Sequence, residues 1–351
     1  MSDLFEDEIS QRLSRFESGV GHYYKPLSDA ADEFIKFAES PHLRVFTGIE
    51  QFDECIRGVA PGELCLINGF AHSGKTVFAT EILMANRDVP TVLFTPDETR
   101  PAVLTKLAAA DTGVGAQELE RRIQRQDKEA KDLLISVAEK YQQLAVYDES
   151  VGLHQMDVMF EEAGEAFGSA PRAVIFDYAE QLNEATDTKG KIDELKRWGK
   201  RHNVALFLLH QTSRTAGSGG KALGIDSGSF GGEQQATFMI VVRRKINFFM
   251  DQLQQLEAKI ANATNPKMIQ NWQDRMTEIL QIEIPRHRDT VSAKLVKNKR
   301  PPMELTNEID FNIDKTTGRL FLIGDGGGDV PPPPQQQFDY ENKGSARGLL
   351  K

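Results

Sequence analysis

The chain has 351 residues, of which 40% are hydrophobic and 27% are charged, with a formal net charge of −10 and a pI near 5.3. This composition is typical of a globular protein with one large domain or two ordinary ones. The negative net charge excludes attraction of nucleic acid by the chain as a whole, so such contacts would have to come from local patches and loops.

The sequence contains no sign of export or membrane insertion. Cys55 and Cys65 are the two cysteines, and both lie in apolar sequence, which favours buried thiols and fits a reducing cytosol. The N-terminus lacks a basic-then-apolar signal sequence, and no apolar run approaches the roughly 18 residues of a membrane span. We therefore expect a cytoplasmic protein with no membrane partner.

Residues 1–43 are mostly polar and contain one amphipathic pattern. Ala30, Phe34, Ile35 and Ala38 recur at helical spacing. This predicts a short N-terminal helical arm that buries its apolar face either on the main domain or on another subunit.

Residues 44–325 alternate short apolar runs with polar helical stretches. This alternation indicates an α/β fold with a mainly parallel central sheet. The expected strands are 63–68, 91–95, 144–147, 173–177, 204–210, 238–243 and 292–297. Helical stretches separate the first five of them.

The sequence GFAHSGKT follows the first expected strand and opens a helical stretch, and it fits the phosphate-loop pattern G-x-x-x-x-G-K-[ST]. Backbone N–H groups of such a loop point at the phosphates of a nucleoside triphosphate, and the helix N-terminus adds positive potential. We expect Lys75 to reach the β- and γ-phosphates and Thr76 to ligate Mg²⁺. The expected nucleotide-binding residues are Gly69, Phe70, Ala71, His72, Ser73, Gly74, Lys75 and Thr76. A chance glycine-rich turn is the alternative, which the flanking strand and helix disfavour.

Two later strands end in acidic residues. The strand 173–177 shows the Walker B pattern, in which a buried strand delivers a carboxylate beside the phosphate loop, so Asp177 is expected to hold Mg²⁺, usually through water. The strand 91–95 runs into Asp97 and Glu98. A carboxylate there could activate the attacking water, with Glu98 the better candidate and Asp97 the second. A solvated acidic turn is the alternative for this segment.

Residues 245–285 interrupt the alternation with a long segment rich in Gln, Lys and Glu. Apolar residues recur at helical spacing in both halves, and Asn265-Pro266 divides them, which predicts an inserted helical hairpin. Residues 326–351 are rich in Gly, Pro and Gln, and we expect this tail to be disordered because it cannot bury enough surface to offset its ordering entropy.

Together these segments resemble the RecA-like motor domain of the DnaB family of replicative DNA helicases, from about Thr47 to Phe321. TGIEQFDECIRGVAPGELCLING is similar to the family's T-G-x-x-x-L-D-x-x-x-x-G-L-x-x-G-x-L, TPDET to S-L-E-M, FDYAEQL to D-Y-L-Q-L and LLHQTSR to S-Q-L-S-R. The resemblance implies ATP and Mg²⁺ as cofactors, Glu98 as the catalytic glutamate, Asp177 as the metal-side acid and Gln211 as the sensor of the γ-phosphate.

The resemblance also implies DNA contacts after the fifth expected strand. SGSFGGEQQAT is similar to the family's S-G-S-I-E-Q-D-A-D, a region that lines the family's central channel and contacts single-stranded DNA. It implies Arg214, Lys221 and Gly228 as DNA-binding residues. Ile225 stands where the family has an arginine and Gln235 replaces an acid, so part of the family pattern is lost. A plain loop is the alternative.

The segment AKLVKNKRPP resembles the family's K-x-R-N-G, whose cations reach the ATP site of the neighbouring subunit as an arginine finger does. Lys297 matches the family's lysine. Lys299 stands at the position of the arginine and Arg300 is one step further, so either can be the second finger. A lysine there would offer a point charge in place of a fork. A basic surface hairpin is the alternative.

These implications together favour an ATP-dependent helicase that translocates on single-stranded DNA as a homo-oligomeric ring, most simply a hexamer. Residues 1–43 are too few for the family's N-terminal collar domain, and in this the chain resembles helicases encoded by bacterial viruses. Primase or a helicase loader is the further partner that the family implies. There are two alternatives. One is a recombinase of the RecA type, which would form a helical filament in place of a closed ring. The other is a KaiC-type or loader-type regulatory ATPase, whose activity single-stranded DNA would not stimulate.

Overall fold

The computed structural model describes residues 27–184, 187–211 and 234–323, and the chain forms two units, residues 1–44 and 45–351. In the first unit, helix α2 spans Leu27–Glu39 and a short 3₁₀ helix spans Pro41–Leu43. The guanidinium of Arg44 lies over the Phe37 ring, 4.1 Å from its centroid, and closes this turn. The helical arm expected from the sequence is therefore present, and the Phe34 side chain on its apolar face is exposed.

The second unit is built on a nine-stranded sheet in the order β3-β2-β4-β5-β1-β6-β7-β8-β9. Strands β1 to β6 pair in parallel, and β7, β8 and β9 continue the sheet in antiparallel fashion. The strands are β1 Leu64–Gly69, β2 Thr91–Phe94, β3 Leu144–Tyr147, β4 Ala173–Asp177, β5 Ala205–Gln211, β6 Phe238–Arg244, β7 Thr290–Asn298, β8 Ile309–Ile313 and β9 Leu320–Leu322. The predicted α/β fold with a mainly parallel sheet is confirmed.

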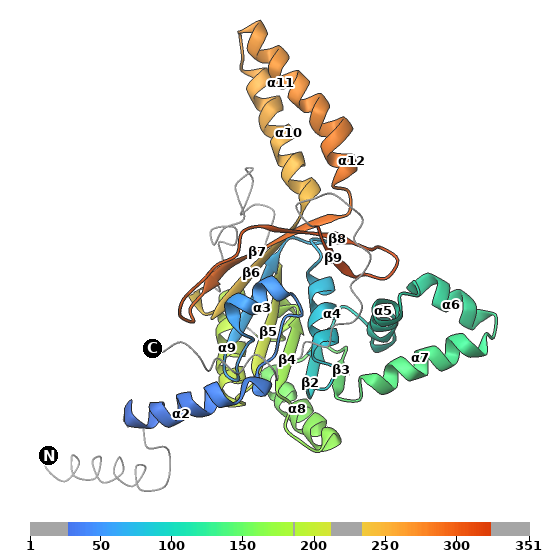
Figure 1. Cartoon of the computed structure of the whole chain (residues 1–351), viewed down its shortest axis with the longest axis vertical. Helices are drawn as coiled ribbons and strands as arrows, with labels where there is room; N and C mark the ends of the chain where they lie inside the picture. The colour runs from blue at the N-terminus through green and yellow to red at the C-terminus, as the bar shows by residue number, and fades with distance from the viewer. Residues whose placement is uncertain (1–26, 185–186, 212–233, 324–351) are drawn as a thin grey trace, which may run out of the picture. The chain divides into compact units, whose positions relative to one another are not determined.

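Helices cover both faces of this sheet (Figure 1). The described helices of this unit are α3 Glu50–Ile56, α4 Lys75–Ala85, α5 Arg100–Thr112, α6 Ala116–Gln124, α7 Lys128–Lys140, α8 Leu153–Phe167, α9 Thr188–Arg201, α10 Lys245–Ala261, α11 Pro266–Glu278 and α12 Ile284–Arg286, of which α10 and α11 project away from the sheet. Side chains of α4 and α5 share one apolar core with Ile67 of β1, whereas side chains of α8 and α9 share the other with Leu66. The two cores arise because successive strand residues point to opposite faces.

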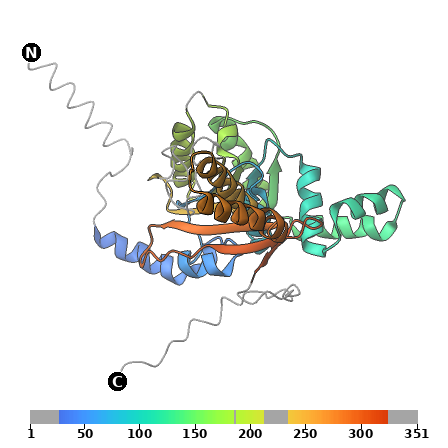
Figure 2. The same cartoon turned by 90° about the horizontal axis from the view of Figure 1, so that it is seen from above.

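The helices begin and end where the local chemistry allows. The Asp127 carboxylate accepts hydrogen bonds from the backbone N–H groups of Glu129 and Ala130 and so caps α7. Helix α5 ends at Gly113, whose φ of +74° is left-handed and favours glycine. Helices α6 and α7 extend to one side of the sheet in both Figure 1 and Figure 2.

The segment 245–285 forms the expected hairpin of α10 and α11. The Asn265 side chain accepts from Lys267 N at 3.0 Å and caps α11, so the Asn-Pro pair acts as a helix start. A small apolar cluster of Phe249, Leu253 and Ile279 packs α10 against the turn that follows α11. A π-helical turn at Ile279–Glu283 and α12 follow α11.

The seven expected strands all form, with ends that shift by at most two residues. Strands β8 and β9 did not appear in the sequence analysis. Their sequences IDFNI and LFL are short, and they add to the outer antiparallel end of the sheet, where alternation over so few residues gives a weak signal. No helix in the part of the chain that the structure describes combines the length and apolar composition of a membrane span. The expected tail at 326–351 lies outside the described residues.

Candidate functional site

The phosphate loop joins β1 to α4, as the motif requires. Gly74 has a φ of +101°, which a residue with a Cβ rarely adopts. A Cβ on Gly69 would lie 2.4 Å from the carbonyl oxygen of Val242 on β6, so the loop starts where the backbones of two strands approach closely. The Ser73 side chain is fully buried inside this turn. The glycines therefore shape a compact loop whose N–H groups open at the N-terminus of α4.

Lys75 is held within the loop that it belongs to. Its ammonium donates hydrogen bonds to the carbonyl oxygens of Gly69 at 2.9 Å and Phe70 at 2.8 Å. Burial lowers the pKa of Lys75, and the carboxylates of Asp177 and Glu180 oppose that shift. The site thus places a buried cation beside acidic groups, where a phosphate would find a preorganised positive charge.

The first residues of α4 and the end of β4 meet across the site. Thr76 Oγ1 donates to Asp177 Oδ2 at 3.1 Å, although the two residues are 101 positions apart in sequence. Burial raises the pKa of Asp177 to about 6, with Glu98 adding to the rise and Thr76 opposing it. Asp177 Oδ1 is buried and has no hydrogen-bond partner among the described residues.

This pair of oxygen ligands fits Mg²⁺. A hydroxyl and a carboxylate are hard donors, and Mg²⁺ commonly takes only one or two protein oxygens and completes its octahedron with phosphates and water. The buried, unpaired Asp177 Oδ1 also suits a cation, because a buried carboxylate oxygen without a partner among the described residues is costly. The residues present are therefore compatible with the cofactor expected from the sequence.

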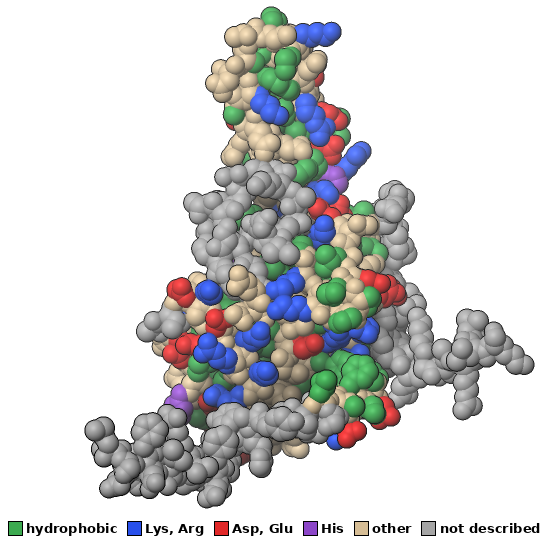
Figure 3. Space-filling view, turned by 90° about the vertical axis from the view of Figure 1, so that its left-hand side faces the viewer, with side chains coloured by type: hydrophobic (Ala, Val, Ile, Leu, Met, Phe, Trp, Pro, Cys, Tyr) green, Lys and Arg blue, Asp and Glu red, His purple; other side chains and the backbone are tan. Residues whose placement is uncertain are grey.

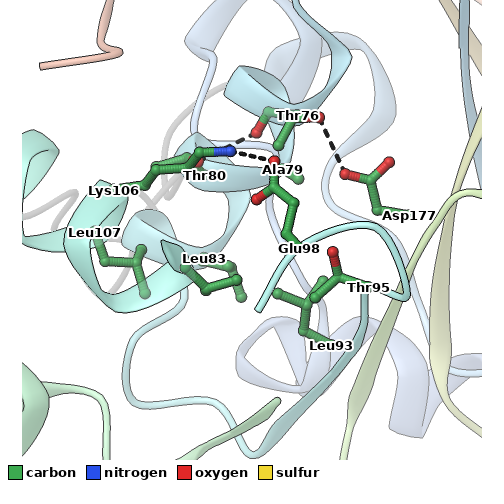
Figure 4. A pocket seen from close by; sticks show the side chains of 11 residues that line it. Thr76, Ala79, Thr80, Leu83, Leu93, Thr95, Glu98, Lys106, Leu107 and Asp177 are labelled. Carbon is green, nitrogen blue, oxygen red and sulfur yellow. Dashed lines mark hydrogen bonds and ion pairs between the residues drawn. The ribbon is translucent and has the colours of Figure 1, made fainter. Parts of the chain in front are cut away.

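A small cavity lies beside this pair, and Glu98 faces it (Figure 4). Its carboxylate forms an ion pair with Lys106 of α5, and Thr76, Thr95 and Asp177 also line the cavity. Asp97, the second candidate for the base, is engaged elsewhere: it accepts hydrogen bonds from the Tyr178 hydroxyl and from Gln181. The geometry thus separates the two neighbouring acids and leaves Glu98 beside the metal-side residues.

Gln211 ends β5 and lies opposite Gly69 of the phosphate loop in the parallel pairing. Its backbone N–H donates to Glu180 Oε1 at 2.9 Å. The sequence analysis missed Glu180 and Lys106 as neighbours of the site. Glu180 follows the Walker B strand by three positions, a spacing that could have suggested it, whereas Lys106 on α5 carries no sequence signal.

The three candidate finger residues differ in their surroundings. Arg300 is buried, donates to the carbonyl oxygens of Ile56 and Gly58, pairs with Glu63 and lies over the Phe238 ring. These bonds hold the Arg300 guanidinium inside its own domain, whereas the sequence analysis considered it as a second finger.

Lys297 and Lys299 remain as candidates. Lys299 is exposed and donates to the carbonyl oxygen of Gln234 at 3.0 Å, and Lys297 lies near the end of β7. Lys and Arg side chains gather below the hairpin on the face shown in Figure 3. Arg214, Lys221 and Gly228 lie outside the described residues.

The phosphate loop lies at one edge of a parallel sheet, together with the two acids Asp177 and Glu98. This arrangement defines a P-loop NTPase with a RecA-like core. A family model described as DnaB-like helicase C terminal domain matches residues 44–281, and the chain belongs to that family. The chain is therefore an ATP-dependent DNA helicase of the replicative type, and the recombinase and regulatory alternatives are not favoured.

Two solved structures show the same fold. One, whose name describes it as an ATPase domain, superposes with a TM-score of 0.62 at 15% identity, over 85% of this chain and 98% of that one. "The Structure Of A DnaB-Like Replicative Helicase And Its Interactions With Primase" gives a TM-score of 0.59 at 15% identity, over 90% of this chain and 71% of that one. No curated protein matches the sequence.

Replacing Arg300 tests whether its role is structural. We expect Arg300→Ala to destabilise the fold by about 3 kcal/mol, because it leaves Glu63 and two backbone carbonyls without their donor. Chemical denaturation measures this loss, with Arg197→Ala on α9 as a matched control. Unchanged stability together with lost ATPase activity would return Arg300 to the list of finger candidates.

Proposed function

We propose that the helicase acts as a homo-oligomeric ring on single-stranded DNA and that each ATP is shared between two copies of the chain. The supporting observation is the position of the candidate finger lysines. Strand β7 is antiparallel to β6, and its end at Asn298 pairs with Phe238 at the start of β6. Lys297 and Lys299 therefore lie at the edge of the sheet opposite the phosphate loop.

The lysines are too far from their own loop to act on it. Gly69 pairs with Val242, four residues along β6 from Phe238, and each strand residue advances the chain by about 3.3 Å. Lys297 and Lys299 are thus separated from their own site by the length of a strand. If they act on a triphosphate, it is one held by another copy, where they would neutralise charge that develops on the γ-phosphate.

Within one copy, we assign the remaining roles from the geometry. The loop Gly69–Thr76 binds the phosphates, and Lys75 neutralises their charge. Thr76 and Asp177 would hold Mg²⁺, which when bound neutralises and orients phosphate oxygens. Glu98 accepts a proton from the attacking water, and Lys106 holds its carboxylate toward the cavity. Gln211 lies beside the loop and would sense the γ-phosphate.

The DNA contacts remain proposals from the family pattern. Arg214, Lys221 and Gly228 follow Gln211 in sequence, and we propose that Gln211 links the γ-phosphate to these DNA contacts. Backbone N–H groups and two cations can contact phosphates without a positive net charge on the chain. Primase is a further proposed partner, since a similar structure is named for a helicase and its interactions with primase. A ring of six and a cytoplasmic location belong to the same proposal.

The two neighbouring acids give a paired test of the chemistry. We expect Glu98→Gln to bind ATP with near-normal affinity and to lose about 100-fold in kcat, because the amide cannot take a proton. Asp97→Asn should lose far less, since Asp97 is bonded to Tyr178 and Gln181. Steady-state ATPase assays and fluorescent-nucleotide titration measure both. The reverse order of effects would assign the base to Asp97.

Strand displacement tests the function itself. We expect the protein to unwind a forked duplex with ATP and Mg²⁺, to hydrolyse ATP faster with single-stranded DNA, and to form a closed oligomer by mass photometry. Lys75→Ala is the control, because loss of the loop cation should abolish nucleotide binding and unwinding together. A protein that stays monomeric with ATP and DNA, or whose ATPase ignores DNA, would contradict the proposal.

A further inference from the structure

Glu180 contacts the last two residues of β5. Its Oε1 accepts a hydrogen bond from the backbone N–H of Gln211 at 2.9 Å and lies 2.6 Å from Nδ1 of His210. The His210 side chain is only 4% exposed, so this contact is inside the domain.

Glu180 itself is fixed by the structure around it. It lies in the short 3₁₀ helix Ala179–Gln181, directly after β4, and its backbone carbonyl accepts from Lys191 of α9 at 3.0 Å. Its carboxylate acts electrostatically on Lys75 of the phosphate loop. Glu180 thus lies close to the end of β4, to the phosphate loop and to the end of β5.

The register of the sheet places Gln211 between the phosphate-loop strand and Glu180. β5 lies between β4 and β1, with Asp177 paired to Leu209 and Gly69 paired to Gln211. Gln211 is therefore held on one side by the phosphate-loop strand, and its own N–H is held by Glu180 from the other side.

We propose that Glu180, with His210, is a positioning residue that holds Gln211 in place, so that ATP turnover responds to single-stranded DNA. Glu180 acts through Gln211, whose backbone pairs with Gly69 of the phosphate loop, and is not itself a catalytic residue. The inference rests on the proposed function, because it assigns Gln211 a role in linking the γ-phosphate to DNA.

The test compares variants that keep or lose the hydrogen bond from Gln211 N–H to residue 180. We expect Glu180→Ala to leave the KM for ATP within about twofold, but to lower DNA-stimulated kcat by about tenfold or more, because misplaced positioning groups lose rate before binding. Glu180→Gln keeps an acceptor oxygen and should recover most of the rate. Glu161→Ala, an exposed acid on α8, is the control and should behave as the wild type.

The outcomes separate this inference from the function on which it rests. Wild-type ATPase without DNA stimulation contradicts the proposed function. Normal stimulation in folded Glu180→Ala overturns the role of Glu180 alone, as does an equal loss in Glu180→Gln. If Glu180→Ala does not fold, Glu180→Asp gives the result, since its shorter side chain cannot reach the Gln211 N–H and should show the same loss of stimulation.

Discussion

The arrangement of the site depends on one constraint: parallel strands deliver their carboxyl ends to a single edge of the sheet. β1 ends in the phosphate loop, β4 ends in Asp177, β2 runs into Glu98 and β5 ends in Gln211. The bond from Thr76 to Asp177 joins two of these ends across the intervening β5. Burial at that edge raises the pKa of Asp177 and lowers that of Lys75, so the edge is electrostatically prepared for a bound phosphate and cation.

The antiparallel strands add a second constraint, because they determine where the candidate finger lysines lie. Because β7 reverses direction, its terminal lysines lie at the edge opposite the phosphate loop. A shared site follows if these cations contribute to catalysis, and hydrolysis in one copy then changes its packing against the next. Arg300 is buried, and its guanidinium contacts Gly58 and Glu63 just before β1. Lys297 and Lys299 are therefore the better candidates for the finger residues.

Much of this could be predicted from sequence, for identifiable reasons. The phosphate loop, the strand ending at Asp177 and the hairpin at 245–285 are local patterns, and the structure places them as expected. The short edge strands β8 and β9 carried too little alternation to detect. The ion pair of Glu98 with Lys106, the contact of Glu180 with His210 and the burial of Arg300 are formed by folding between distant segments, which no local pattern encodes.

Mixing two inactive variants tests the shared site most directly. Glu98→Gln removes the base from one half of a site, and a Lys297→Ala/Lys299→Ala double variant removes the cations from the other half. In a mixed oligomer, some interfaces combine the intact halves of both variants. The account predicts that DNA-stimulated ATPase of the mixture rises well above the sum of the two separate preparations. Activity equal to that sum, with mixed oligomers shown to form, would contradict it.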